Sequence, residues 1–371
     1  MTTPRRIGGL FQTELTDRQQ ENSRLNLQEA EAGAVELASY PRRLVLELTN
    51  MCNYRCVMCG RNAKSFRPTY LELDFLEALE PLFAHVEEVT LFGWGEPTIH
   101  PEFLFLMDFL SRFPHLRIYL LTNGSTLGVL RRYVDNGALD ILAVSLDGAD
   151  AETNDAIRCG SDFGYITGKL KDIADLRHQG VDVPFINLVF VIMHSTVHQL
   201  PDMVRLTHDL GLPELKAVYL TSFDGLLEDE VFWHDPEAYR APRDEALALA
   251  EELGVLVKFP PVIGEDALGE AAHKTCHVAW RDLFIGSDKT IRPCQSSALS
   301  LGGITKADLA TPEAFFALWN SPSMQAFRAT VNDAEGMDPG CARCYQSSHA
   351  NWNMRHAHIQ GDSETIPEWE A

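Results

Sequence analysis

The chain has 371 residues, enough for two domains or for one large barrel with an appendage. Its formal net charge of −22 argues against a nucleic-acid partner, because affinity for a phosphate backbone depends on clustered lysine and arginine. The start of the chain is followed by no sustained apolar run, so we also expect no membrane partner, and a cytoplasmic location.

Residues 1–40 are polar and helix-prone, most clearly over Glu21–Leu37, and we interpret them as a lead-in segment. Apolar runs typical of strands then alternate with helical patterns. The expected strands are Leu44–Leu48, Val89–Phe92, Ile118–Leu121, Ile141–Leu146, Ile186–Met193 and Ala217–Leu220. The expected helices include Leu71–Phe83, Phe103–Phe113, Val129–Gly137 and Leu200–Leu210.

Repeated strand-then-helix units predict an α/β fold with a parallel sheet and right-handed crossovers. Six such units over residues 41–225 favour a partial (β/α)6 TIM-type barrel, whose active site would lie at the carboxyl ends of the strands. Residues 226–275 break the rhythm and are predicted to be a connector, with a helix over Asp244–Leu253 and a strand over Val255–Phe259.

The remaining sequence predicts a small C-terminal domain over residues 276–348, followed by a loose tail over 349–371. Turn formers between two apolar stretches indicate a β-hairpin over Leu283–Pro293. One helix is expected after it, over Pro312–Val331.

Three cysteines follow the first predicted strand, at Cys52, Cys56 and Cys59. Closely spaced cysteines are a known way of holding an iron–sulfur cluster. Three thiolates leave the fourth iron of a cube without a protein ligand, and an open coordination position is typical of a catalytic site. The triplet therefore indicates an enzyme.

Four more cysteines, Cys276, Cys294, Cys341 and Cys344, lie around the predicted hairpin and helix. Four thiolates can saturate a second cluster, which then suits electron transfer. A zinc site is the alternative, because tetrahedral sulfur ligation also suits zinc. The eighth cysteine, Cys159, is either a small buried hydrophobe or a reactive or substrate-facing thiol.

The Cys-x3-Cys-x2-Cys spacing resembles that of the radical S-adenosylmethionine (SAM) enzymes, and three further motifs strengthen the resemblance. They are Phe92–Pro97, Thr122–Gly124 and Val144–Gly148, each at the end of a predicted strand. The resemblance implies a 4Fe–4S cluster that binds SAM at its open iron. It also implies reductive cleavage of SAM to methionine and a 5′-deoxyadenosyl radical, which abstracts a hydrogen atom from the substrate.

Carried over motif by motif, the resemblance implies a set of SAM-contacting residues. Trp94 stands where the family commonly has glycine, and Met58 stands where it often has an aromatic residue that touches adenine. The implied contacts are Tyr54, Met58, Gly93, Trp94, Gly95, Glu96, Pro97, Asn123, Ser145 and Arg158.

The second cysteine set resembles the twitch domain, the short form of the SPASM extension, which holds one auxiliary 4Fe–4S cluster. Its spacing is most similar to that of radical SAM dehydrogenases of aminocyclitols, which implies oxidation of a small polar metabolite, with an electron passing to the auxiliary cluster. Such a reaction also needs a base, and His194, Tyr219 and Asp224 are candidates near strand ends. A flavodoxin- or ferredoxin-type reductant is the implied partner.

Two other functions stay open at this point. The chain could be a maturase of a ribosomally made peptide, because oxidative cross-linking uses the same steps. It could also be a non-enzymatic iron–sulfur electron carrier or a zinc scaffold.

Overall fold

A computed structural model describes the following parts of the chain: residues 6–7, 10–11, 15–63, 67–135, 137–223, 225–263, 276–294, 299–333 and 335–347. Asp224 and residues 264–275 of the predicted connector lie outside them, as does the predicted tail.

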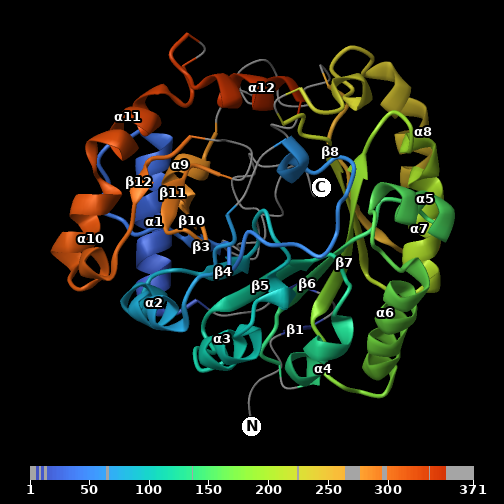
Figure 1. Ribbon diagram of the computed structural model, residues 1–371, viewed down its shortest axis with the longest axis horizontal. Helices are drawn as coiled ribbons and strands as arrows, with labels where there is room; N and C mark the ends of the chain where they lie inside the picture. Colours follow the sequence, from blue (N-terminus) through green and yellow to red (C-terminus); the bar gives the residue numbers. More distant parts are fainter. Residues whose placement is uncertain are drawn as a thin grey trace.

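The centre of the molecule is a curved ten-stranded sheet with the order β12-β11-β10-β3-β4-β5-β6-β7-β8-β9 (Figure 1). All neighbours from β10 to β9 pair in parallel. The strands are β3 (Arg43–Leu46), β4 (Glu88–Leu91), β5 (Arg117–Thr122), β6 (Ile141–Ser145), β7 (Phe185–Ile192), β8 (Glu214–Tyr219), β9 (Leu256–Lys258), β10 (Asp282–Ile285), β11 (Thr290–Arg292) and β12 (Gly302–Gly303). A separate two-stranded sheet joins β1 (Arg6–Ile7) to β2 (Leu10–Phe11).

Helices cover the outer face of the parallel strands, and α10 and α11 lie beside the β10–β12 edge (Figure 1). The helices are α1 (Asp17–Glu31), α2 (Leu73–Ala78), α3 (Phe103–Leu110), α4 (Leu127–Asp135), α5 (Ala151–Ile157), α6 (Phe163–His178), α7 (Leu200–Asp209), α8 (Glu237–Leu253), α9 (Val278–Arg281), α10 (Pro312–Trp319), α11 (Pro322–Thr330) and α12 (Pro339–Ser347). Short 3-10 turns join several of them, including η2 (Glu80–Ala84) after α2.

The predicted partial barrel is confirmed, since the six expected strands form neighbouring parallel strands β3 to β8. A seventh, β9, pairs in parallel with β8 where the sequence indicated only a short strand of the connector. The prediction of one helix over Pro312–Val331 is wrong in one respect, because the segment forms two helices, α10 and α11. Pro322 causes the break, since proline has no N–H to donate and its ring clashes with the preceding helical turn.

The hairpin predicted for the C-terminal domain forms between β10 and β11. In addition, β10 pairs in parallel with β3, in the register Asp282 to Arg43 and Ile285 to Leu46. The hairpin therefore extends the barrel sheet at its β3 edge. As a result, it lies directly beside the strand that leads into the Cys52–Cys59 loop.

A row of buried charges closes the amino-terminal end of the sheet. The first residues of β10, β3, β4 and β5 are in register and alternate in sign: Asp282, Arg43, Glu88 and Arg117. Arg43 Nε donates to Asp282 Oδ1 at 3.0 Å, and Arg281 Nε reaches the same oxygen at 2.7 Å. Burial alone would raise the pKa of Asp282, but Arg281 and Arg43 lower it to about 2. Asp282 is therefore the anion that holds β10 against β3 at this end.

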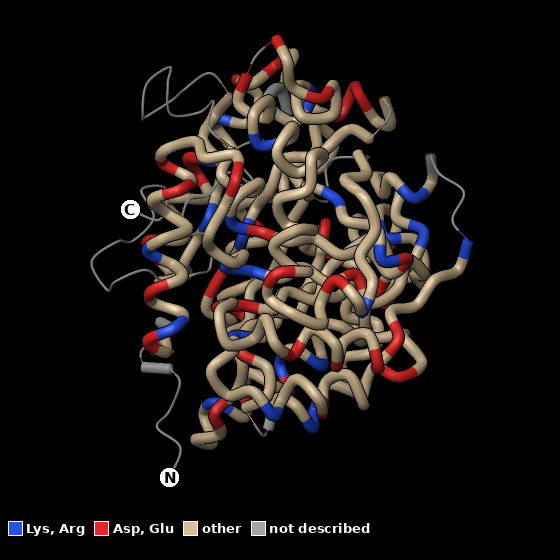
Figure 2. Tube along the Cα trace, turned by 90° about the vertical axis from the view of Figure 1, so that its left-hand side faces the viewer, with Lys and Arg blue, Asp and Glu red and all other residues tan. Residues whose placement is uncertain are grey.

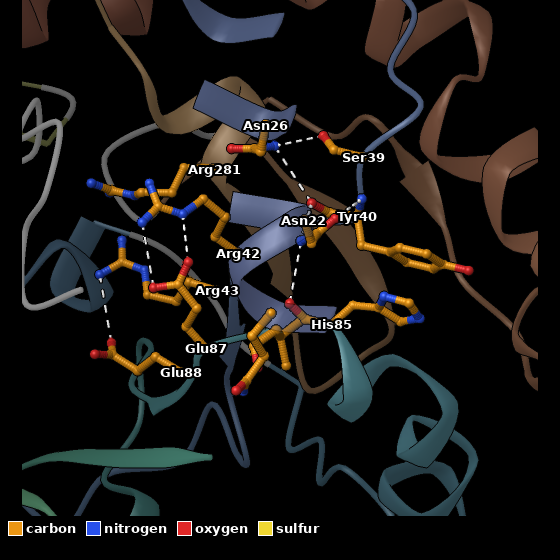
Figure 3. A network of polar contacts seen from close by, with 12 residues as sticks. Asn22, Asn26, Ser39, Tyr40, Arg42, Arg43, His85, Glu87, Glu88 and Arg281 are labelled. Atoms are coloured by element: carbon orange, nitrogen blue, oxygen red, sulfur yellow. Dashed lines mark hydrogen bonds and ion pairs between the residues drawn. The ribbon is translucent and has the colours of Figure 1, made fainter. Parts of the chain in front are cut away.

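Helix α1 covers the same end with a polar face rather than an apolar one (Figure 3). Asn26 Nδ2 donates to the Trp280 carbonyl at 2.8 Å and to Ser39 Oγ at 2.9 Å. Asn22 receives the Tyr40 N–H at 2.8 Å and donates to the His85 carbonyl at 3.2 Å. These amides satisfy loop backbone groups that lie too far from the sheet to pair within it.

Lys and Arg positions are scattered through the fold among a larger number of Asp and Glu positions (Figure 2). Within the described residues, none of the helices has the length and apolar character needed to span a bilayer.

The Asp282 contacts give a first testable prediction. Replacing Asp282→Asn should lower the free energy of unfolding by about 3 kcal/mol, because it leaves two buried arginines without their anion. Chemical denaturation of the reconstituted protein measures this. The Asp282 carboxylate, with a pKa near 2, stabilises the fold at every pH above the range in which aspartate side chains ordinarily titrate. That stabilisation is lost as the pH falls through about 2. The difference between wild type and D282N should therefore narrow at acid pH.

The matched control is Asp172→Asn, which breaks an exposed ion pair with Lys169 on α6. Exposed pairs contribute roughly 0–1 kcal/mol, so this variant should stay near wild type. Equal effects of the two substitutions would contradict the importance assigned to the buried row.

Candidate active site

A cavity of about 310 Å³ opens inside the sheet, towards the carboxyl ends of the strands. Cys56 and Cys59 border it on one side, and Cys294 borders it on another. Gly93, Trp94, Ser145 and Arg158 line the wall near the first two cysteines. Much of the remainder is apolar, with Val45, Leu121, Val189, Val191 and Val218 among the lining residues, and the charged Arg43, Lys216, Arg281 and Asp282 line it too. The cavity is thus bordered by members of both predicted cysteine sets.

The Cys52–Cys59 loop is held by backbone contacts on both sides. Arg55 N–H donates to the Cys159 carbonyl, and Val57 N–H donates to the Ile157 carbonyl, each at 2.9 Å. Cys52 Sγ accepts from the Tyr54 N–H at 3.4 Å and from Asn123 Nδ2 at 3.8 Å. The loop is therefore fixed between the end of α5 and the end of β5, and two of its cysteines, Cys56 and Cys59, border the cavity.

The chemistry of the three thiols fits a bound cationic cluster. Burial is the main cause that raises the pKa of Cys56 to about 12; Arg158 opposes the rise, and Asp147, Cys59 and Cys52 add to it. Within the described ranges no three acidic, histidine or cysteine side chains lie close enough to hold a single metal ion. The thiols are nevertheless near enough to disfavour one another's thiolate form, and bound iron would remove that repulsion.

The Gly93–Trp94–Gly95 turn follows β4 and packs tightly against the cysteine loop. A Cβ atom on Gly95 would lie 2.2 Å from the Thr49 carbonyl oxygen and 2.3 Å from that of Met51. The tryptophan is accommodated because its indole leaves the turn and packs edge-on against Phe223, with ring centroids 5.0 Å apart. Trp94 therefore leaves the backbone path of the motif intact.

Glu96 is buried and its carboxylate already accepts protein hydrogen bonds. Oε1 accepts from the hydroxyls of Thr98 and Thr122 at 2.5 and 2.7 Å, and Oε2 accepts from the Asn123 N–H at 2.7 Å. Burial raises its pKa, and these hydrogen bonds oppose the rise. In this arrangement Glu96 joins the ends of β4 and β5, and Oε2 keeps room for one more donor.

Most of the other predicted cofactor contacts gather at the same wall. Ser145 and Arg158 line the cavity, and Met58 lines it next to Cys59. Arg158 Nε lies 2.7 Å from Asp147 Oδ2, so a buried acid holds the guanidinium at the cavity wall. Tyr54 is buried, and burial raises its pKa to about 12. Pro97 is also buried and begins the short 3-10 turn after Glu96.

The second cysteine set converges near the hairpin. Burial raises the pKa of Cys341 to about 12, and both Cys294 and Cys276 contribute to the rise. Cys341 and Cys344 are three residues apart on α12, a spacing that places two side chains on one face of a helix. The Cys276 N–H donates to Asn332 Oδ1 at 2.6 Å, which fixes this cysteine beside the end of α11. This donor set also fits a cluster. Cys159, in contrast, is exposed.

The three candidate bases are placed differently. Tyr219 lines the cavity, but its hydroxyl donates to the Pro261 carbonyl at 2.7 Å. His194 stacks on Phe232 with centroids 4.2 Å apart and is not among the lining residues. Asp224 lies outside the described residues. A catalytic role for any of them stays a prediction.

Two acids that the sequence motifs did not single out organise the site. Asp147 holds Arg158, and Glu47 accepts the Trp94 N–H at 2.7 Å. Both are charged residues that come just after an apolar strand. That position in the sequence could have indicated that they belong to the site.

Comparison with known proteins agrees with this geometry. The family model described as the radical SAM superfamily matches residues 46–207, and an iron-sulfur cluster-binding domain model, SPASM, matches residues 276–345. The chain belongs to the radical SAM superfamily. Its cofactors are SAM and two 4Fe–4S clusters. By its residues, the first cysteine loop would hold the SAM-binding cluster, and the second set would hold the auxiliary cluster.

Several characterised relatives share part of the chain. Mycofactocin maturase MftC of Mycobacterium tuberculosis is 31% identical over 180 residues, which cover 46% of this chain and 43% of that protein. The match thus spans less than half the length of this relative. The cofactor-modifying protein of the tungsten-containing aldehyde ferredoxin oxidoreductase of Pyrococcus furiosus is 27% identical over 81% of this chain and 86% of its own length.

Solved structures show the same fold. SuiB of Streptococcus suis bound to SAM superposes with a TM-score of 0.62 at 15% identity, covering 83% of this chain and 72% of SuiB. The enzyme anSMEcpe with bound SAM gives a TM-score of 0.58 at 16% identity, covering 88% of this chain and 94% of that one. At these identities the likeness extends to the fold alone. The aminocyclitol dehydrogenase resemblance finds no further support here.

The contacts of Gly95 give a second prediction. Gly95→Ala should displace the cysteine loop, because the added methyl would overlap two carbonyl oxygens. We expect anaerobically reconstituted G95A to lose about half its iron and to release no 5′-deoxyadenosine on reduction. Iron analysis and chromatography measure both quantities.

Gly168→Ala is the control, because Gly168 is exposed on α6 and an added Cβ would meet nothing within 4 Å. It should retain wild-type iron and stabilise the helix by up to about 1 kcal/mol. A G95A protein with full iron content and SAM cleavage would contradict the tight packing described here.

Proposed function

We propose that this radical SAM enzyme is a maturase that modifies a ribosomally made peptide. The observation that carries the proposal is one cavity bordered by both cysteine sets. A substrate group inside it would lie between the SAM-binding loop and Cys294. When bound, the SAM-binding cluster supplies the electron that cleaves SAM into methionine and a 5′-deoxyadenosyl radical. The substrate would give a hydrogen atom to that radical and a proton to a base, and the auxiliary cluster, held by the second cysteine set, would be able to accept the remaining electron.

The comparisons favour a peptide over a free metabolite. MftC, the relative of highest identity given above, is named a maturase. A second SuiB structure contains its precursor peptide SuiA, and its fold covers 87% of this chain. The sequence first suggested oxidation of a small polar metabolite, and these relatives support the peptide alternative better.

We assign two roles to the residues at the cavity: binding SAM and excluding water. The Gly93–Gly95 turn, Glu96 next to it and Ser145 would bind the polar groups of SAM, and Arg158, held by Asp147, would take its carboxylate. Of these residues, Gly93, Ser145 and Arg158 line the cavity. Val189, Val191 and Val218 provide an apolar wall that excludes water from the reacting carbon. A flavodoxin- or ferredoxin-type protein would supply the first electron.

A small molecule is the second candidate substrate. The Pyrococcus relative, which this chain matches over most of both lengths, is named for modifying a cofactor. Val45 and Tyr119 also line the cavity, and its volume of about 310 Å³ would suit a compact molecule.

The test is product analysis with SAM and a reductant. Reconstituted protein is incubated with peptides encoded near its gene and, separately, with aminocyclitols and sugars. A peptide that loses two hydrogens or changes in mass supports the maturase. Ketone or aldehyde formation from the small molecules, with no peptide modified, would overturn it.

Cysteine substitutions test whether the two clusters have separate roles, one in SAM cleavage and the other in accepting an electron. Replacing Cys52, Cys56 or Cys59 by Ala should abolish SAM cleavage, because the SAM-binding cluster would lose a ligand. Cys294→Ala should instead allow uncoupled release of 5′-deoxyadenosine while product formation falls below detection. Equal loss of both activities in C294A, with the first cluster intact by electron paramagnetic resonance (EPR), would contradict an electron-accepting auxiliary cluster.

A further inference from the structure

We infer that Glu47 is a positioning residue that couples the SAM-binding turn to the hairpin of the auxiliary cluster. The inference rests on the proposed role of Gly93–Gly95 in binding SAM. Glu47 is the first residue after β3, and its side chain is 1% exposed. It lies outside the cysteine motif, and it is not one of the residues that line the cavity.

The carboxylate of Glu47 contacts two segments that are far apart in the chain. Oε2 accepts the Trp94 N–H at 2.7 Å. Oε1 accepts the Ser287 hydroxyl at 2.9 Å and the Ser287 N–H at 3.3 Å. Arg292 Nη1 lies 3.8 Å from Oε2. One buried anion therefore serves the turn after β4 and the turn between β10 and β11.

The contact with Trp94 sets the direction of the neighbouring carbonyl. The peptide bonds of the described chain are trans, so the Gly93 carbonyl points away from the N–H that Glu47 holds. That carbonyl therefore faces away from Glu47, where Gly93 and Trp94 border the cavity. A Cβ on Gly93 would lie 2.4 Å from Glu47 Cγ, so only glycine fits here. Glu47 thereby presents a backbone acceptor to the ammonium group of SAM.

The contact with Ser287 fixes the turn between β10 and β11. Ser287 Oγ also lies 2.6 Å from Thr69 Oγ1, which ties the hairpin turn to the segment after the cysteine loop. From this turn β11 runs to Arg292 and then to Pro293 and Cys294, which border the cavity. A shift of the turn would therefore be transmitted along three strand residues to a ligand of the auxiliary cluster.

The chemistry of the contacts requires a carboxylate. Two of its partners, the Trp94 N–H and the Ser287 N–H, can only donate, and an ionised carboxylate only accepts. Glutamine has the same length but would turn its NH₂ group towards either Trp94 N–H or Ser287. One buried donor would then lose its partner, which is more costly than losing an exposed contact.

The experiment compares wild type, Glu47→Gln and Glu72→Gln in the full-length protein with both clusters reconstituted. Glu72→Gln is the matched control, because Glu72 Oε2 contacts Lys289 Nζ of the same hairpin turn at 2.9 Å but is exposed. SAM affinity is measured from the SAM-induced change in the EPR spectrum of the first cluster. The spectrum of the auxiliary cluster is recorded with and without SAM. Both readouts need no substrate, so a failure to modify a peptide leaves the test unaffected.

We expect E47Q to retain both clusters, to bind SAM about tenfold more weakly and to lose the SAM-dependent change at the auxiliary cluster. E72Q should match wild type in both respects. The inference is overturned if E47Q binds SAM within twofold of wild type, if E72Q shows the same losses, or if SAM leaves the wild-type auxiliary spectrum unchanged.

Ser287→Ala provides a second variant if E47Q does not load its clusters. It removes the hydroxyl donor on the hairpin side and leaves the Trp94 contact intact. S287A should therefore keep wild-type SAM affinity while the response of the auxiliary cluster weakens. An unchanged response in S287A would also overturn the inference.

Discussion

The arrangement of the site depends on the parallel pairing of β10 with β3. This pairing joins two segments that are about 240 residues apart and places their carboxyl ends at the same edge of one sheet. The cysteine loop leaves that edge from β3, and the hairpin turn leaves it from β10. This pairing is what places Cys294 at the cavity that Cys56 and Cys59 also border.

Buried charge makes this pairing specific. An apolar strand edge would accept many registers, whereas a slip of one residue would move Asp282 away from Arg43 and place it beside Leu44. Burying an unpaired carboxylate is strongly unfavourable, so the row from Asp282 to Arg117 penalises every other register. Glu47 acts at the opposite end of the same strand. The interface is therefore set at both ends by acids whose partners lie on the neighbouring segments.

The sequence predicted the parts of the fold that depend on local patterns. Apolar runs located β3 to β8 because buried parallel strands are continuous stretches of valine, isoleucine and leucine. The cysteine spacing located both donor sets. The joining of β10 to β3 could not be predicted, because strand pairing over such a separation leaves no periodic trace in either segment. The break at Pro322 was visible in the sequence, but the apolar pattern on both sides favoured one continuous helix.

The missed site residues share a physical cause. Glu47 and Asp147 each lie just after an apolar strand, where a charge is usually read as the point at which the chain reaches solvent. Here the strand ends inside the barrel mouth, and the charge is held by backbone N–H groups and arginines instead of water. An acid at the last inward position of a buried parallel strand must therefore have donors supplied by neighbouring loops. In this protein those loops carry the predicted cofactor contacts, so each such acid both satisfies its own charge and sets the geometry of the site.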